Sequence, residues 1–394
     1  MTDMNSDKPM PGIKISIIST NLSTNATNRC VMLAKALSKK FDVEIVGTTF
    51  GKTIWPPLLS GLDLRIQSVP GKLLPGYITS IWRLLKLLDG EVIIACKPRF
   101  PSFGVALIKR AISGVPVILD IDDDELAMTL PGKKSRLLNK LRHTNGYLFT
   151  RWMNRLGGRA SGFFCVSEFF RKIYGGVIVP HGQNMAVLDP DKYDPVSIRH
   201  DIGIHKDQVI IGFVGTLHPH KGVDLILAAM RRLNNPNLLL MVVGAPLDHP
   251  YANELQQQYP GMLLLIPPQP LEKLPMYLAA SDMVVLPQRN TPESLGQMPA
   301  KLTDAMAMAK PIIASGLSDI PDYLEDCGLV VDPDDVEALA DKIAWVASHK
   351  ELAIVMGRKA RERAIEKLSL DAMLQAMESE IQRVLPNRQQ NSRS

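Results

Sequence analysis

Two segments in the second half of the chain carry residue types that suit a bound phosphate. The first is an apolar strand at 209–214, then a loop with Gly215, Lys221 and Gly222, and then an apolar-periodic helix at 223–233. Such a loop directs backbone N–H groups, the positive end of a helix and one ammonium group to a single place. The pattern therefore predicts a phosphate site.

The second segment places a cation and a carboxylate on the first turns of another expected helix. Lys301 and Asp304 follow Pro299, and proline is favoured at the start of helices. A cation and a carboxylate at this spacing are able to hold a phosphate and the hydroxyl pair of a ribose. Together the two segments predict a site for a nucleotide sugar.

These segments resemble the retaining glycosyltransferases of the GT-B fold, in particular family 4 (glycosyl transferases group 1), which uses nucleotide-sugar donors. The resemblance extends to the segments 274–287, 160–168 and 179–182 and covers roughly residues 12 to 365. It implies an α/β fold in which two Rossmann-like domains face one another across a cleft. The donor would bind at the carboxyl ends of the strands of the second domain.

The resemblance also implies roles for individual residues. Lys221 and Lys301 would stabilise the departing diphosphate, and Asp304 would bind the ribose hydroxyls, so both lysines are expected to be catalytic. The residues expected to bind the donor are Gly215, Thr216, Lys221, Gly244, Pro287, Gly296, Lys301, Leu302 and Asp304.

The chain departs from the family pattern at two of these positions. Thr216 stands where relatives often have an arginine, so that one donor-binding charge is missing, and His218 or His220 is the candidate substitute. Gly296 falls where relatives have the first of two glutamates. Glu293 is a nearby carboxylate that would replace it, and Gly296 would offer backbone N–H groups instead.

The first strand-to-helix turn, 19–28, differs from that of relatives, which carry a Gly-Gly pair there. It contains serine, threonine and asparagine and no glycine. Thr20, Asn21 and Asn25 are expected to bind a sugar acceptor, and the alternative is that such residues only cap the helix near Asn28. The chain has no G-x-G-x-x-G motif, which argues against a nicotinamide-dependent dehydrogenase.

A run of carboxylates at 120–125 follows another expected strand. Asp122 and Asp123 fall where relatives often have a His-Asp pair, so they are expected to be catalytic and to contact the acceptor or the donor sugar. Clustered like charges raise the pKa of at least one carboxyl group. Two alternatives are a magnesium site and a solvated loop. The resemblance implies neither a metal nor any cofactor besides the nucleotide sugar, which is a co-substrate.

The charge of the chain is divided unequally between its halves. The net charge of +5 combines +11 in residues 1–200, from 27 Lys and Arg against 16 Asp and Glu, with −6 in the remainder. The basic half predicts an anionic partner. No nucleic-acid recognition motif is present, so an anionic membrane surface is the better candidate. The segments 133–159 and 77–88 read as basic amphipathic helices that would contact it, or else as helices that pack on the sheet.

Short apolar strands alternate with helices along the chain, which predicts parallel sheets. In the first half they are expected at 13–19, 43–47, 91–95, 115–120, 163–166 and 176–179. The expected organisation is a disordered N-terminus at 1–12, an acceptor-side domain at 13–188, a linker at 189–205, a nucleotide-sugar-binding domain at 206–365, a helix at 366–386 that returns to the first domain, and a tail at 387–394.

The sequence shows no signal peptide, no run of 18 apolar residues and no C-x-x-C pair, so we expect a cytoplasmic protein, and its basic half would allow peripheral binding to the inner face of the membrane. Its expected activity is transfer of a sugar from a nucleoside-diphosphate donor to a glycan or lipid-linked acceptor. Two alternatives stay open: a nucleotide-sugar epimerase on the same fold, and a nucleotide-sugar-binding protein without turnover.

Overall fold

The computed structural model describes residues 12–55, 64–129, 143–245 and 250–385. Residues 1–11 of the N-terminus expected at 1–12, the tail expected at 387–394, and the first part of the basic segment, 133–142, lie outside the described residues. The chain divides into two compact units. Unit 1 comprises Met1–Pro180 and Leu370–Ser394, and unit 2 comprises His181–Ser369.

Unit 1 contains a parallel sheet with the strand order β3-β2-β1-β4-β5-β6-β7. The inner strands β4 and β5 are buried along their whole length, and their sequences are apolar apart from Asp120 in β5. The strands are β1 (Lys14–Ser19), β2 (Asp42–Thr49), β3 (Arg65–Pro70), β4 (Val92–Cys96), β5 (Val117–Ile121), β6 (Gly162–Cys165) and β7 (Val177–Ile178).

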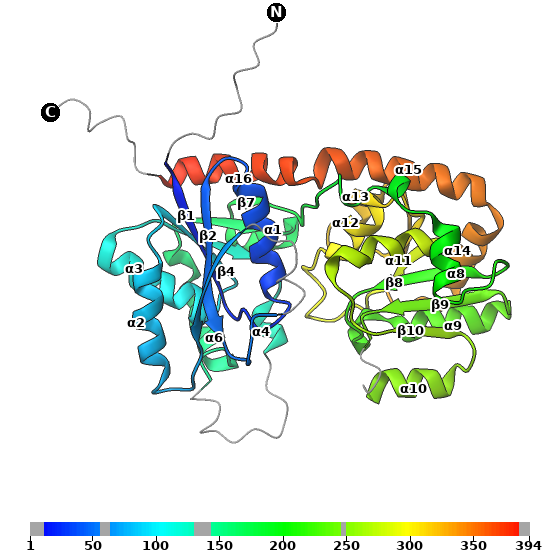
Figure 1. The fold of residues 1–394 in the computed structure, drawn as a ribbon, viewed down its shortest axis with the longest axis horizontal. Helices are drawn as coiled ribbons and strands as arrows, with labels where there is room; N and C mark the ends of the chain where they lie inside the picture. The colour runs from blue at the N-terminus through cyan, green and yellow to red at the C-terminus, as the bar shows by residue number, and fades with distance from the viewer. Residues whose placement is uncertain (1–11, 56–63, 130–142, 246–249, 386–394) are drawn as a thin grey trace, which may run out of the picture. The chain divides into compact units, whose positions relative to one another are not determined.

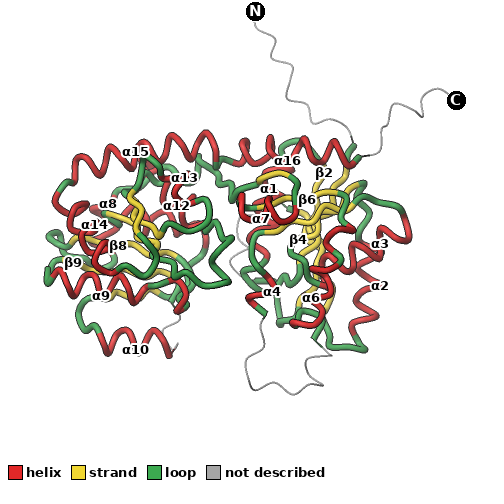
Figure 2. The backbone as a smooth tube through the Cα atoms, turned by 180° about the vertical axis from the view of Figure 1, so that it is seen from behind, coloured by secondary structure: helices red, strands yellow, loops and turns green. Residues whose placement is uncertain are grey.

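Helices cover both faces of this sheet (Figures 1 and 2). They are α1 (Thr27–Leu37), α2 (Tyr77–Leu87), η2 (Phe100–Gly104), α3 (Val105–Ser113), α4 (Glu125–Met128), α6 (Tyr147–Arg155), η3 (Gly157–Arg159), α7 (Glu168–Tyr174) and α16 (Leu370–Val384). The last helix packs on α1, where Lys40 and Glu378 form an ion pair at 3.0 Å. Glu380 of α16 also accepts a hydrogen bond of 3.1 Å from the N–H of Phe163 in β6, so the end of the chain belongs to unit 1.

Unit 2 contains a second parallel sheet, in the order β10-β9-β8-β11-β12-β13. Its strands are β8 (Val209–Val214), β9 (Leu238–Val243), β10 (Leu263–Ile266), β11 (Met283–Leu286), β12 (Ile312–Ser315) and β13 (Leu329–Val331). In both sheets the direction of winding reverses beside the first strand, between β1 and β4 and between β8 and β11. Ligands of doubly wound sheets bind outside the carboxyl ends of the strands at this point.

The helices of unit 2 pack around an apolar core in which α9 meets α14. They are η4 (Pro190–Lys192), α8 (Pro195–Asp201), η5 (Pro219–Lys221), α9 (Val223–Leu233), α10 (Pro250–Gln258), η6 (Leu271–Lys273), α11 (Leu274–Ala280), α12 (Ala300–Ala307), α13 (Ile320–Leu324), α14 (Val336–Ser348) and α15 (Lys350–Lys367). The segment 189–205, read from sequence as a linker, contains η4 and α8 and lies within unit 2. Asp194 caps α8 by accepting from the N–H groups of Val196 and Ser197.

A buried ion pair fastens α1 to the sheet of unit 1. The Nη2 atom of Arg29 lies 2.7 Å from the Asp120 carboxylate at the end of β5, and both side chains are buried. The same guanidinium donates to the carbonyl groups of Val179 (2.8 Å) and Pro180 (3.1 Å). Arg29 therefore connects α1, β5 and the last residues of the first segment of unit 1.

Among the described residues, no helix has the length and apolar character needed to cross a bilayer.

We expect Arg29→Met to lower the free energy of unfolding by about 3–5 kcal/mol, because it leaves the Asp120 carboxylate buried without its partner. Arg65→Met is the matched control, since Arg65 and Asp42 form an exposed ion pair at 3.3 Å whose loss costs at most about 1 kcal/mol. Urea unfolding of both variants measures the difference. Equal losses would contradict a special role for the buried pair.

Candidate functional site

The loop after β8 approaches α12 closely enough to require glycine. Gly215 directly follows β8 and has a φ of +137°. A Cβ atom at this position would lie 2.2 Å from the Cε atom of Lys301. The side chain of Lys301 therefore crosses the backbone at the carboxyl end of β8, which brings together two residues that are distant in sequence.

A second glycine brings the loop after β11 against the start of α9. Gly222 has a φ of +71°, and a Cβ atom there would lie 1.9 Å from the carbonyl oxygen of Pro287. Arg289 holds the same loop in place by forming ion pairs with Asp224 on α9 and with Asp334. As a result Lys221, just before Gly222, lies beside the carboxyl end of β11.

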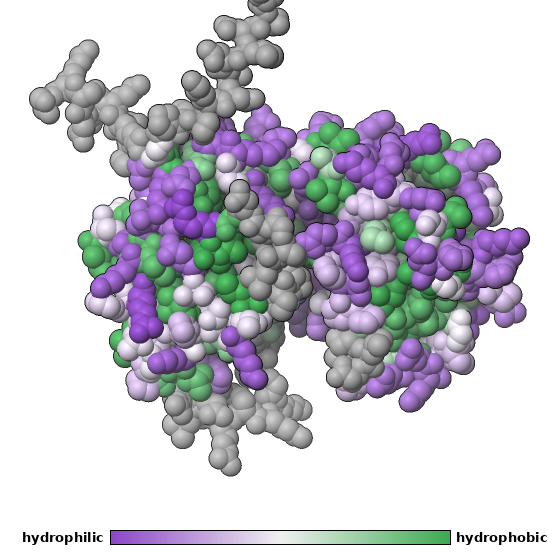
Figure 3. Space-filling view, viewed as in Figure 1, coloured by the Kyte–Doolittle hydropathy of each residue, from purple (hydrophilic) through white to green (hydrophobic). Residues whose placement is uncertain are grey.

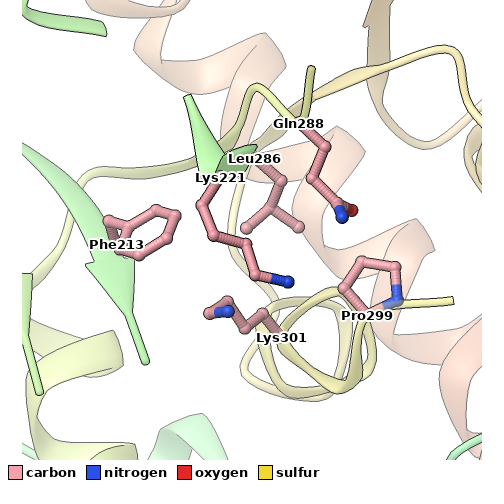
Figure 4. Close-up of a pocket in the computed structure, with 6 residues that line it drawn as sticks. All are labelled: Phe213, Lys221, Leu286, Gln288, Pro299 and Lys301. Carbon is pink, nitrogen blue, oxygen red and sulfur yellow. The ribbon is translucent and has the colours of Figure 1, made fainter. Parts of the chain in front are cut away.

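Lys221 and Lys301 extend into one small pocket, which we call the lysine pocket (Figure 4). Its lining residues are Phe213, Lys221, Leu286, Gln288, Pro299 and Lys301. The Nζ atom of Lys301 lies 5.1 Å from the ring centroid of Phe213. Within the described part of the chain, Lys301 takes part in no hydrogen bond or ion pair, whereas Lys221 donates to the Oε1 atom of Gln297 at 3.4 Å.

The electrostatics of the lysine pocket favour the arrival of an anion. Burial lowers the pKa of Lys301 to about 7, and the positive charge of Lys221 acts in the same direction. Burial raises the pKa of Asp304 to about 7, against a hydrogen bond from Gln183 and the charge of Lys301, which lower it. An anion between the two lysines would relieve their repulsion and restore the charge of Lys301.

Three glutamines that the sequence did not single out belong to this site. The Nε2 atom of Gln288 donates to the Oε1 atom of Gln297 at 3.0 Å, and Gln183 donates to the Oδ1 atom of Asp304 at 2.6 Å. Gln288 is 3% exposed, and its Oε1 atom accepts no hydrogen bond from any described residue. In the sequence, these glutamines stand out only by where they occur: Gln288 follows an expected strand, and Gln183 follows the expected hinge at 181–182.

The other residues expected to bind the donor differ in their position and exposure. Gly244, with a φ of +104°, packs its Cα against the carbonyl oxygen of Gly215, where an added Cβ would lie at 3.0 Å. Thr216 is exposed and Gly296 is buried. By contrast, the side chain of Leu302 is fully buried and its N–H group donates to the carbonyl of Pro299. The expectation that Leu302 binds the donor is therefore not supported, because it has no group to offer.

Of the two histidines of the β8–α9 loop, His220 does not replace the missing arginine charge. The rings of His218 and His220 stack at 5.6 Å between centroids. Burial lowers the pKa of His220 to about 4, and the charge of Lys221 contributes. His220 is consequently neutral at neutral pH. Glu293, the proposed replacement carboxylate, is half-buried in the segment before Gly296.

In unit 1 the acidic run forms a compact carboxylate cluster of Asp122, Asp123 and Glu125 around the ammonium of Lys97. The Nζ atom of Lys97 lies 2.9 Å, 2.7 Å and 2.6 Å from these three carboxylates. Although burial alone would lower it, the three negative charges hold the pKa of Lys97 well above its ordinary value. The sequence had suggested carboxylates that repel one another, and it missed Lys97, which follows β4 and forms an ion pair with each of the three.

The carboxylate cluster has the geometry of a cation site that is filled by the protein itself. The oxygen atoms of its three members lie within 4.8 Å of one another, as metal ligands would. Lys97, only 6% exposed and with a φ of +69°, places its ammonium among them. Asp123 is the most exposed member, with 22% of its side chain accessible.

The turn after β1 is held together by its own polar groups. The Oδ1 atom of Asn21 accepts from the N–H groups of Ser23 (3.0 Å) and Phe50 (3.3 Å), and Thr20 is buried. Asn25 is exposed and is thus the one of the three expected acceptor residues that presents its side chain to solvent. The suggestion that a side chain near Asn28 caps the following helix was wrong, since the N-cap of α1 is Ala26 and no side-chain oxygen accepts there.

Comparison with known proteins agrees with this geometry. Residues 197–363 match the family model "Glycosyl transferases group 1". The chain is 30% identical over 195 residues to a D-inositol 3-phosphate glycosyltransferase of Saccharomonospora viridis, covering 45% of this chain and 44% of the relative. It is 28% identical over 251 residues to an alpha-maltose-1-phosphate synthase of Mycolicibacterium smegmatis, covering 57% and 64%. The matches thus span roughly half of the length of these relatives.

Solved structures match almost the whole chain. HepE of Anabaena, crystallised with UDP and glucose, has a TM-score of 0.74 at 17% identity over 94% of this chain and 100% of its own. A sucrose-phosphate synthase of Thermosynechococcus elongatus has a TM-score of 0.72 at 18% identity over 94% and 98%. Residues 197–363 of unit 2 are thus similar to the glycosyl transferases group 1 family, and the two parallel-sheet units have the GT-B fold.

Proposed function

We propose that this chain is a glycosyltransferase that transfers a sugar from a nucleoside-diphosphate donor to a glycan or lipid-linked acceptor with retention of the anomeric configuration. The observation that carries the proposal is the lysine pocket. Lys221 and Lys301 meet at the carboxyl ends of β8 and β11, where the winding of the sheet reverses, inside a domain of a glycosyltransferase family.

The proposed chemistry requires positive charge at the leaving group. When the bond between the anomeric carbon and the diphosphate breaks, negative charge develops on the departing oxygen. Lys221 and Lys301 would stabilise this charge, together with the N–H groups at the start of α12, which has no side-chain cap. The acceptor hydroxyl would attack from the face that the diphosphate leaves.

The nucleoside would be held by groups beside the lysine pocket. The Asp304 carboxylate would accept hydrogen bonds from the ribose hydroxyl pair, and the free Oε1 atom of Gln288 is a further acceptor. Gly215, Gly244, Pro287 and Gly296 would shape the surroundings with backbone atoms, and Thr216 would offer a hydroxyl. HepE, which shares the fold, was crystallised with UDP and with UDP-glucose, so uridine donors are the first to test.

Unit 1 would supply the acceptor side. We propose that Asp122 or Asp123 accepts hydrogen bonds from sugar hydroxyls, with Lys97 keeping the cluster compact, and that Asn25 contributes an exposed amide. Asn21 would act by shaping the turn after β1, because its Oδ1 atom accepts within that turn, and Thr20 would act through its buried position, where its carbonyl accepts from Asn145.

We also propose that unit 1 contacts an anionic membrane on the cytoplasmic side. Ile78 and Trp82 on α2 are 61% and 60% exposed, and Lys86 lies over the ring of Trp82 at 3.4 Å. On α6, Trp152 is 49% exposed beside basic residues. Apolar and strongly polar side chains adjoin one another over α2 and α3 in Figure 3. Four buried free thiols fit a reducing compartment.

A panel of UDP-, GDP- and TDP-sugars tests the proposed function against its alternatives. A transferase slowly hydrolyses one donor in the absence of acceptor. An epimerase instead interconverts isomeric sugars, and a binding protein without turnover leaves every donor intact. Product analysis by chromatography separates the three results.

Lys221→Ala is expected to lower the rate of donor hydrolysis or transfer by roughly 10²-fold, because it removes charge from the departing diphosphate. Lys206→Ala is the control, since Lys206 is exposed in the loop before β8, at the opposite end of the strand. An unchanged rate in Lys221→Ala would refute the role of this lysine.

The affinity for UDP is expected to fall as the pH rises above about 7, because Lys301 has a pKa of about 7 and binds phosphate in its charged form. Lys301→Arg keeps its charge throughout this range and should abolish the fall, while Lys301→Met should bind weakly at every pH. Calorimetric titrations above pH 7 measure this. A wild-type affinity that is constant there would contradict the assignment.

The chain is expected to bind vesicles containing phosphatidylglycerol and not vesicles of phosphatidylcholine alone, with binding that weakens in high salt. The double variant Trp82→Ser, Trp152→Ser should lose most of the bound fraction, because both exposed indoles would enter the interface. Leu352→Ser, an exposed position in unit 2, serves as the control. Co-sedimentation in which all three proteins bind equally would dismiss this surface.

A further inference from the structure

The proposed ribose-binding carboxylate is already held by a side chain from a distant segment. The Nε2 atom of Gln183 donates to the Oδ1 atom of Asp304 at 2.6 Å. The other oxygen, Oδ2, has no hydrogen-bond partner among the residues that the structure describes. Asp304 is half-buried on the first turns of α12, one turn beyond Lys301. Its carboxylate is thus fixed through one oxygen and open at the other.

Gln183 is itself held at a defined place in unit 2. Its backbone N–H donates to the carbonyl of Leu368 at 2.9 Å, and it forms an isolated parallel bridge with Ser369. The chain passes from unit 1 to unit 2 after Pro180 and returns after Ser369. Gln183 therefore lies near the first residue of unit 2 and is hydrogen-bonded to the last residues of the same unit. These backbone contacts hold the Cα atom of Gln183 in place, and its side chain extends from there to Asp304.

We propose that Gln183 is a positioning residue for the donor nucleoside: its amide orients the Asp304 carboxylate and keeps one of its oxygen atoms directed at the ribose hydroxyl pair. This inference rests on the proposed function, because it assigns the carboxylate to a nucleoside. Gln183 acts through Asp304 and need not touch the donor.

The charges around Asp304 support this assignment. Lys301 is the nearest charge on its own helix, and α15, which packs on α12, contributes Arg361, whose guanidinium donates to the carbonyl of Ala307 at the far end of α12. Burial raises the pKa of Asp304 to about 7, while the hydrogen bond from Gln183 lowers it. Without that bond more of the carboxyl group would be protonated at neutral pH, and a protonated group is a poorer acceptor for two hydroxyls.

The test compares two nucleotides across a range of pH. Gln183→Met keeps the side-chain length and removes the donor, and Gln183→Glu replaces the donor with a second carboxylate. Each variant of the full chain is titrated calorimetrically with UDP and with 2′,3′-dideoxy-UDP, which lacks the hydroxyl pair, between about pH 6 and pH 9. Gln257→Met, an exposed position on α10, is the matched control.

The expected result is a loss of UDP affinity of about fivefold to tenfold at pH 7 in Gln183→Met and a larger loss in Gln183→Glu. Measured against the wild-type affinity at the same pH, the loss in Gln183→Met should shrink as the pH rises and Asp304 ionises, although both affinities fall as Lys301 loses its charge. Affinity for the dideoxy nucleotide should stay at the wild-type value. Equal losses for both nucleotides would show a merely structural role and overturn the proposal, as would unchanged UDP affinity. If the wild-type chain binds neither UDP nor GDP, the proposed function falls, and this inference falls with it.

Discussion

The burial of two lysine side chains in one pocket is the constraint on which the candidate site depends. Lys221 and Lys301 share one pocket, and burial together with the charge of Lys221 brings the pKa of Lys301 down to about 7. Folding tolerates this because Gly215 leaves room for the Lys301 side chain and Gln297 accepts from Lys221. Burying charged lysines costs free energy while the pocket is empty. An anion therefore binds more favourably there than in a pocket whose charges are already paired within the protein.

Whereas unit 2 buries two charges of the same sign, unit 1 buries charges of opposite sign together. It too gathers charge at the carboxyl ends of its strands, but there the ammonium of Lys97 lies within 2.6–2.9 Å of three carboxylates. These charges compensate one another, so the cluster has less to gain from an ion. The two units thus differ in electrostatics although their sheets are wound alike: one brings two lysines into a single pocket, and the other places one lysine among three carboxylates, of which Asp123 is the most exposed.

The sequence predicted the strands well because parallel strands that are buried on both faces are continuous apolar runs. It missed β3, an edge strand in which half of the residues are polar and which pairs with β2. Lys221, Lys301 and Asp304 could be found from local spacing. Gln183 and Lys97 could not, because the partners of each lie far along the chain, and Gln288 could not because its partner Gln297, nine residues later, is brought to it by the fold of the loop after β11. The burial that makes His220 neutral was likewise invisible in the sequence.

The spacing of Lys301 and Asp304 would ordinarily lead to a different outcome. Oppositely charged side chains three residues apart on a helix tend to pair with each other. Within the described residues the two form no ion pair, and Asp304 instead accepts from Gln183. Because a neutral amide holds the carboxylate, neither charge cancels the other completely. One helical turn can therefore offer a cation to a phosphate and an acceptor to a ribose at the same time, which two mutually paired side chains could not do.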